Sequence, residues 1–216
     1  LPTVKVDENL CSGCGICVAA CNYGTAHLIE VEELFEGRVF RTRRISHTDP
    51  IKCKACGMCV SACPSGAREL VPDVSTLEIQ KIDYKPGIIC FACKFGWGYT
   101  SNYEVFSKFK SMIPVACIGK VDASDILNSF NKGADGVLLL GCADGDCHFQ
   151  DGNQEARKRF YLIQKIMESF GLEKERLEVI TSIDPQGERI PGIVNGMVDR
   201  LKGLGPIKSK EAKHGR

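Results

Sequence analysis

The sequence lacks an excess of charge of either sign. Its 28 basic and 27 acidic side chains leave a formal net charge of +1 over 216 residues. Proteins that bind nucleic acid or lie on a membrane surface normally carry a basic field, so this balance argues against both partners. A near-zero charge with 44% hydrophobic residues also excludes a disordered chain. We therefore expect a folded protein that binds no nucleic acid.

Long apolar segments are missing too. Residues 137–140 form a typical apolar run, which is far too short to cross a bilayer. Residues 1–6 show neither the basic nor the apolar region of an export signal. We therefore expect no membrane span and a cytoplasmic location, in a compartment that keeps thiols reduced.

The usual patterns of a substrate site are absent as well. No G-x-G-x-x-G follows a predicted strand, and no Walker loop occurs, so we expect no flavin or nucleotide on this chain. No Ser-His-Asp arrangement or pair of carboxylates stands out either. We assign no residue to acid–base catalysis.

Cysteine, in contrast, is abundant, with 13 residues. The number is odd, so a closed disulfide framework would leave one thiol over. Without an export signal, many cysteines indicate thiolates that hold metal.

Eight cysteines fall in two copies of one motif, and the second copy begins 42 residues after the first (53 minus 11). The first copy reads Cys11-Ser-Gly-Cys14-Gly-Ile-Cys17-Val-Ala-Ala-Cys21 and the second reads Cys53-Lys-Ala-Cys56-Gly-Met-Cys59-Val-Ser-Ala-Cys63. Pro64 follows the second copy, and Asn22 takes the matching place in the first, where we expect it to serve only as a turn residue. Such a repeat predicts a pseudo-symmetric pair of sites.

The spacing C-x2-C-x2-C-x3-C is that of bacterial [4Fe–4S] sites, in which the fourth cysteine binds the neighbouring cluster. We therefore predict two [4Fe–4S] clusters with crossed ligands. One is assigned to Cys11, Cys14, Cys17 and Cys63, and the other to Cys53, Cys56, Cys59 and Cys21. A zinc site would leave the third cysteine of each loop unexplained, and disulfides would need an oxidising compartment.

Residues 3–72 resemble the two-[4Fe–4S] ferredoxin family on these motifs. The resemblance implies an α+β ferredoxin-like dicluster domain, which we place at residues 1–76. The segment between the motifs is longer than a compact member needs and carries Arg41, Arg43 and Arg44. We favour a solvated hairpin there over a docking edge for an acidic partner.

From residue 87 onward, short apolar runs alternate with helical patterns, which predicts an α/β domain with a small parallel sheet. We place it at residues 87–205, after a linker at 77–86 and before a polar tail at 206–216. The predicted strands are 88–91, 113–118, 137–140 and 177–181, and the predicted helices are 102–110, 124–131, 155–170 and 193–201.

Five more cysteines follow three of these strands: Cys90, Cys93, Cys117, Cys142 and Cys147. Because ligands bind beyond the carboxyl ends of parallel strands, we expect all five thiols at one rim of the sheet. Five unliganded thiols or a Cys90–Cys93 redox pair are alternatives, but a further metal cluster uses four of the five. Spacing alone does not exclude zinc. Short loops predict the pairs Cys90 with Cys93 and Cys142 with Cys147, so Cys117 is the expected spare or substitute ligand.

The same region resembles the delta subunit of methyl-viologen-reducing hydrogenase. The resemblance runs over residues 88–158 and rests on Cys90-Phe-Ala-Cys93, Gly141-Cys142, Gly145-Asp-Cys-His148 and Gly152-Asn153. It implies one [2Fe–2S] cluster. It also implies two partners, namely a hydrogenase or other dehydrogenase component and a flavin-containing, heterodisulfide-reductase-like subunit.

The two resemblances together imply an iron–sulfur electron-transfer subunit of an anaerobic oxidoreductase complex, or a fragment of its flavin subunit, with no substrate site of its own. A free ferredoxin-like carrier and an assembly module with purely structural clusters are the alternatives. Near-zero net charge and the added domain argue against a free carrier.

Overall fold

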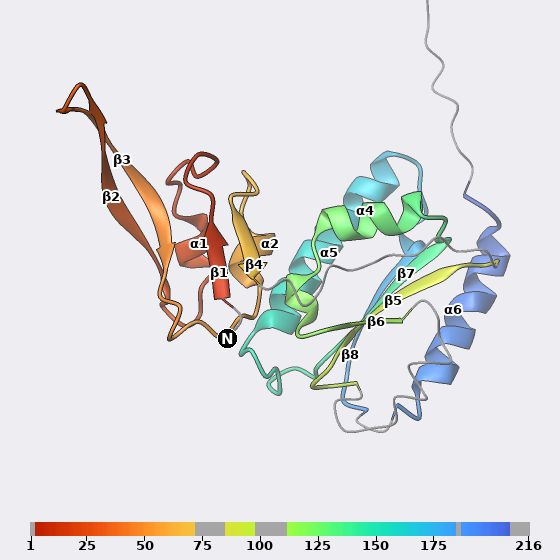
Figure 1. The fold of residues 1–216 in the computed structure, drawn as a ribbon. Helices are drawn as coiled ribbons and strands as arrows, with labels where there is room; N and C mark the ends of the chain where they lie inside the picture. Colours follow the sequence, from red (N-terminus) through yellow and green to blue (C-terminus); the bar gives the residue numbers. More distant parts are fainter. Residues whose placement is uncertain (1–2, 72–84, 98–111, 185–186, 208–216) are drawn as a thin grey trace, which may run out of the picture.

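A computed structural model describes residues 3–71, 85–97, 112–184 and 187–207. Figure 1 shows a small first domain that carries a long hairpin, beside a second domain built on a four-stranded sheet. The end of the predicted linker and the start of the predicted tail lie in the described part. The helix predicted at 102–110 and most of the linker and tail fall outside it.

The first domain is a small α+β unit. Strand β1 (Thr3–Val6) pairs antiparallel with β4 (Arg68–Val71), and two short helices, α1 (Ile16–Ala19) and α2 (Met58–Ser61), lie against the pair. The residue before each helix is a glycine with a φ of 79°, Gly15 and Gly57. A positive φ favours glycine, so each motif copy enters its helix by the same turn. The 42-residue repeat of the sequence is therefore also a repeat of the backbone.

A two-stranded hairpin extends from this domain, away from the second one (Figure 1). It consists of β2 (Ala26–Phe35) and β3 (Arg38–Thr48). Glu36 and Gly37 form its turn, both with positive φ, as a two-residue turn between twisted strands requires. Four apolar side chains near this turn are exposed: Leu34, Phe35, Val39 and Phe40.

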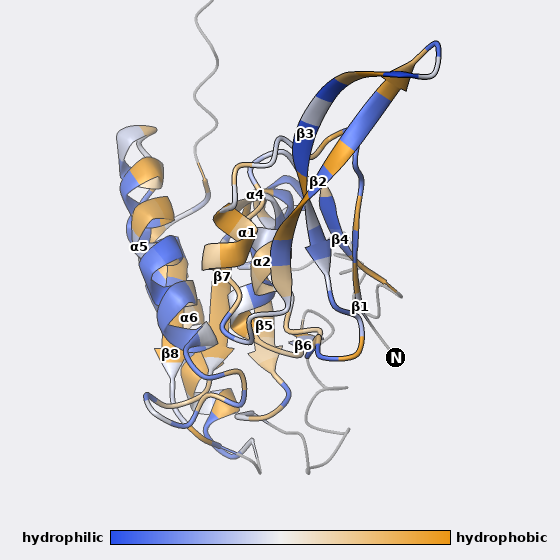
Figure 2. Ribbon diagram, turned by 90° about the vertical axis from the view of Figure 1, so that its left-hand side faces the viewer, coloured by the Kyte–Doolittle hydropathy of each residue, from blue (hydrophilic) through white to orange (hydrophobic). Residues whose placement is uncertain are grey.

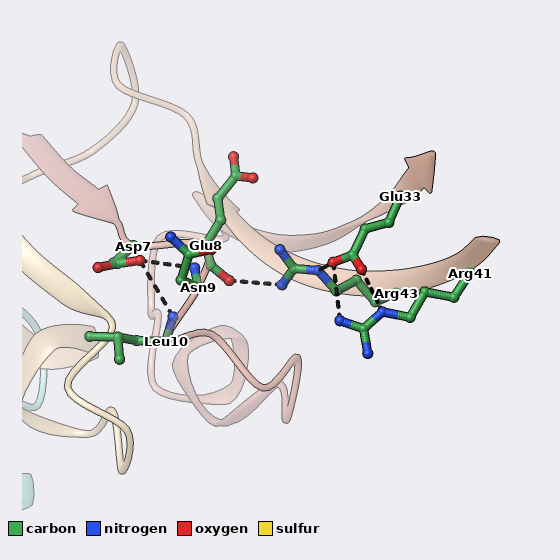
Figure 3. A network of polar contacts seen from close by, with 7 residues as sticks. All are labelled: Asp7, Glu8, Asn9, Leu10, Glu33, Arg41 and Arg43. Atoms are coloured by element: carbon green, nitrogen blue, oxygen red, sulfur yellow. Dashed lines mark hydrogen bonds and ion pairs between the residues drawn. The ribbon is translucent and has the colours of Figure 1, made fainter. Parts of the chain in front are cut away.

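The hairpin arginines bind within their own domain (Figure 3). Glu33 accepts hydrogen bonds from both Arg41 and Arg43. Arg43 also donates to the carbonyl oxygen of Glu8 at 2.7 Å, in the loop that leads to Cys11. Arg41 therefore pairs within the hairpin, and Arg43 also connects the hairpin to the loop before Cys11.

The second domain contains the predicted parallel sheet, in the order β6-β5-β7-β8. Its strands are β5 (Ile88–Cys93), β6 (Met112–Val115), β7 (Gly136–Gly141) and β8 (Leu177–Thr181). Every residue of β5 and β7 is buried, and Figure 2 shows these strands as an apolar centre behind the more polar face of a helix. Residues 116–118, predicted to continue the second strand, instead leave it for the 3-10 helix η1 (Ile118–Lys120).

Helices cover both faces of this sheet (Figure 1): α4 (Ala123–Asn131) and α5 (Gly152–Ser169) lie on one side and α6 (Ile190–Leu204) on the other. A further 3-10 helix, η2 (Lys174–Arg176), leads into β8. Asp122 caps α4 by accepting from the backbone N–H of Asp125, whose side chain accepts from Asp122 in return. Within the described residues, no helix is both long enough and apolar enough to cross a membrane.

The strand order places a natural binding point at the end of β5. From β5, the chain builds β6 on one side and then β7 and β8 on the other. In open parallel sheets, ligands bind at the carboxyl ends of the strands where this direction reverses. In this domain, that point lies beyond β5 and β7, where Cys93 and Cys142 stand.

Candidate metal centres

The first cysteine set, Cys11, Cys14, Cys17 and Cys63, lines one pocket together with Ser46 and Arg68. The backbone N–H of Ser46 donates to the Cys11 sulfur at 3.3 Å, and the Cys17 thiol lies 3.1 Å from the Ser46 hydroxyl. Strand β3 thus supplies polar support to a loop from elsewhere in the chain. A Cβ at Gly13 would collide with the carbonyl oxygen of Arg44, so only glycine lets the loop approach this strand so closely.

The second cysteine set, Cys21, Cys53, Cys56 and Cys59, also gathers in space. Burial, with negative charge on the other three thiols, raises the pKa of the Cys56 thiol to about 11, against a backbone hydrogen bond from Met58 that lowers it. The pKa of Cys59 rises for the same two reasons, although Arg68 opposes the rise. These four thiols therefore lie close enough to repel one another as anions, so a positively charged core is needed to hold all four as thiolates.

The two cysteines that cross between copies have matching surroundings. Burial disfavours ionisation of Cys21, but the Thr25 hydroxyl and backbone N–H groups of residues 23, 25 and 26 lower its pKa. Around Cys63, the Ser65 hydroxyl and the N–H groups of residues 65–67 do the same against burial. In both cases, the turn that follows the motif copy favours the thiolate form of its last cysteine.

Arg68 shows that the space between these sets suits an anion. It is only 3% exposed. It donates to the hydroxyls of Ser46 and Thr48, but its Nε has no partner among the described residues. A buried cation with an unused donor is costly unless negative charge lies nearby. A cluster held by four thiolates is negatively charged, so both sets fit a [4Fe–4S] group.

The third cysteine set lies at the switch point of the sheet and consists of Cys93, Cys117, Cys142 and Cys147. The sulfurs of Cys93 and Cys142 are 3.4 Å apart. The thiol of Cys147 shares hydrogen bonds with Cys117 and Cys142. Three loops, which follow β5, β6 and β7, thus bring four sulfurs into contact.

Protonation is uneven in this set, because neighbouring thiols compete for the same protons. A hydrogen bond with Cys142, supported by the N–H groups of residues 95 and 96 against burial, lowers the pKa of Cys93 to about 7. Hydrogen bonds from Cys117 and Cys142 lower the pKa of Cys147, and the N–H groups of Asn153 and Phe149 add to this. The pKa values of Cys117 and Cys142 are raised, above all by their hydrogen bonds to Cys147. All four can ionise together only when a bound metal cation takes up the charge.

Cys90 is placed differently from the sequence prediction. Strand β5 runs on to Cys93, so Cys90 lies inside the strand and not in the loop beyond it. Successive side chains of a strand point to opposite faces, so Cys90 and Cys93 face opposite sides of the sheet. Burial alone raises the pKa of Cys90, with no contribution from another thiol. The expectation that all five thiols share one rim is therefore wrong for Cys90, and Cys117 takes its place in the group.

Other residues close the space around the third cysteine set. A Cβ at Gly152 would lie 2.5 Å from the Cys117 sulfur, and one at Gly96 would lie 3.2 Å from the Cys142 sulfur. Asn153 donates to the carbonyl oxygens of Cys142 and Ala143, each at 3.0 Å. The ring of His148 stacks on Phe95 at 3.7 Å, which accounts for it without a ligand role.

The sequence reasoning missed several residues at these sites. Asn22, taken there as a simple turn residue, donates to Asp151 in the second domain. Met58 is buried at the contact between the domains, where its sulfur lies against Gly119. Both positions differ between the two motif copies. That difference was the only sign in the sequence that these residues have a role of their own.

The donors at these sites are thiol groups, the ligands that iron–sulfur clusters use. All 13 cysteines are free thiols. Among the described residues, no three Cys, His, Asp or Glu side chains converge on the position of a single metal ion. The fit rests on the three groups of four thiols, on the backbone N–H groups that point at them and on the buried Arg68.

Two family models match separate parts of the chain. The family described as "4Fe-4S dicluster domain" matches residues 10–67. The family described as "Methyl-viologen-reducing hydrogenase, delta subunit" matches residues 88–205, more than half of the chain.

Individual relatives fall into two groups. The vhc iron-sulfur subunit of the F420-non-reducing hydrogenase of Methanococcus voltae is 33% identical over 127 residues, which are 58% of this chain and 88% of that protein. The corresponding vhu iron-sulfur subunit of Methanococcus maripaludis is 33% identical over 128 residues, or 56% of this chain and 95% of that protein. One subunit of the Ferredoxin/F(420)H(2)-dependent CoB-CoM heterodisulfide reductase of Methanosarcina acetivorans is 29% identical over 210 residues, which are 95% of this chain but 26% of that protein.

Exchange of Cys63 for Ser tests the crossed ligands. Because Cys63 shares a pocket with Cys11, Cys14 and Cys17, we expect Cys63→Ser to release those three thiols. Anaerobic alkylation followed by mass spectrometry measures this, since bound thiolates resist alkylation. The matched control is Cys21→Ser, which should expose Cys53, Cys56 and Cys59 instead. If each exchange instead exposes the remaining cysteines of its own motif copy to alkylation, the ligands do not cross.

Alanine exchanges at Cys90 and Cys117 test the third set. We expect Cys117→Ala to lose the third EPR signal after dithionite reduction, together with about two of roughly ten iron atoms for a [2Fe–2S] centre. Cys90→Ala should keep both, because Cys90 faces away from the other thiols. Retention of the signal in Cys117→Ala and its loss in Cys90→Ala would restore the sequence prediction.

Proposed function

The chain belongs to the family of the methyl-viologen-reducing hydrogenase delta subunit, and we propose that it is an iron–sulfur electron-transfer subunit with three centres. Two [4Fe–4S] clusters are assigned to the first and second cysteine sets, and a [2Fe–2S] cluster to the third. The observation that carries the proposal is the gathering of twelve of the 13 cysteines into three groups of four.

Iron–sulfur clusters, when bound, take up and release single electrons. The protein's own part is to hold and tune them. Backbone N–H groups that point at the cysteine sulfurs favour the thiolate form and balance negative charge. Arg68 supplies a fixed positive charge beside Cys59. Burial of most thiols of the third set excludes water from that site.

Each assigned group offers four thiolates, so no iron position is left open for a substrate. The protein therefore moves electrons and depends on other subunits for substrate chemistry. Its thiols need a reducing compartment, which supports a cytoplasmic location.

The proposed partners follow from the two groups of relatives. One group is named as iron-sulfur subunits of hydrogenases, and the other belongs to heterodisulfide reductases. We place this chain between a hydrogenase or other dehydrogenase component and a flavin-containing, heterodisulfide-reductase-like subunit. The match of 95% of this chain to 26% of the larger reductase subunit supports that position, because both domains occur together in that protein.

An EPR-monitored redox titration of anaerobically purified protein tests the proposal. We expect about ten iron atoms per chain and three reducible centres, since two cubanes and one [2Fe–2S] cluster supply them. A structural module would hold iron that is not reduced in the physiological range. Iron near eight with zinc in addition would contradict a third iron centre and leave the dicluster domain intact.

A further inference from the structure

The two domains meet at helix α2. The Met58 side chain is 5% exposed, and its sulfur occupies the position into which a Cβ at Gly119 would project. The same sulfur lies 3.8 Å from where a Cβ at Gly152 would stand, and that position is 2.5 Å from the Cys117 sulfur. Met58 therefore reaches from beside Cys59 of the second cysteine set to the wall of the third.

Hydrogen bonds also join the two domains beside Met58. The Ser61 hydroxyl lies 3.1 Å from the carbonyl oxygen of Gly119 and 3.0 Å from that of Lys120. Asn22 donates to Asp151, the residue before helix α5. Each of these first-domain residues stands close in sequence to a ligand of the second cysteine set, either Cys21 or Cys59.

The internal repeat shows that these contacts are specific to one cluster site. The residues 42 positions away from Met58, Ser61 and Asn22 are Ile16, Ala19 and Pro64. Ile16 is 45% exposed where Met58 is buried. The two motif copies share their backbone, so their differences mark what the second domain requires.

We propose that Met58 and Asn22 are positioning residues that hold the second cysteine set against the third, which makes the second set the middle site of the chain. This inference rests on the proposed function, because it assumes that the third cysteine set holds a redox centre. The first cysteine set is then the outer site. Figure 1 agrees, since α2 faces the second domain and α1 lies toward the hairpin. Cys14 of the outer set is exposed.

Exchange of Met58 for Glu tests the proposal, with Ile16→Glu as the matched control. Each exchange stands one residue before a cluster cysteine, so any effect on the adjacent ligand is shared. A carboxylate at Met58 would be buried against Gly119, which is costly, so the contact should open. In the fully reduced holoprotein, we expect Met58→Glu to lose the magnetic interaction between the third EPR signal and the dicluster domain. Ile16→Glu should keep it, and both should retain their iron.

Hydrogen exchange of the same holoproteins gives a second measurement. The backbone amides of residues 118–121 should exchange faster in Met58→Glu than in the wild-type protein. In Ile16→Glu their exchange rates should be unchanged. If Met58→Glu loses iron, Asn22→Ala and its repeat counterpart Pro64→Ala decide the question, with loss of the interaction expected only in Asn22→Ala. An interaction that survives in Met58→Glu and Asn22→Ala, or that is lost equally in the controls, would overturn the inference. Absence of a third signal in the wild-type protein would instead overturn the proposed third centre.

Discussion

Helix α2 and the loop after strand β6 pack so closely that glycine is required at Gly119, and the arrangement of the three cysteine sets depends on this contact. The Met58 sulfur and the backbone of Gly152 both occupy positions that a Cβ at Gly119 would contact. The distance between the second and third cysteine sets is therefore fixed by packed side chains, as electron transfer between fixed centres requires.

A second constraint is electrostatic. Groups of four adjacent, largely buried thiols do not all ionise beside one another unless a cation takes up the charge. Backbone N–H groups donate hydrogen bonds to the sulfurs of Cys11, Cys21 and Cys117, and one buried guanidinium adds positive charge. Arg68 contacts Ser46 of the wall around the first set and also lies near Cys59 of the second. One positive charge thus serves two neighbouring anionic sites.

The sequence was sufficient to predict the repeated motif, the four parallel strands and the gathering of cysteines at the strand ends, because ligand spacing and hydrophobic periodicity are local signals. It failed at Cys90, because the strand continues to Cys93 and side chains three residues apart in a strand point to opposite faces of the sheet. It also failed at Asn22 and Met58, whose partners lie in the other domain. Those contacts are long-range, and only the differences between the motif copies hinted at them.

Anomalous diffraction at the iron absorption edge, from crystals of anaerobically prepared protein, tests the central claim most directly. The account predicts iron at three places, each among four cysteines of one set, with the iron of the second set between the other two. It also predicts no iron within bonding distance of Cys90. Iron bound by Cys90, or a first cysteine set that lies nearer than the second to the third centre, would contradict the account.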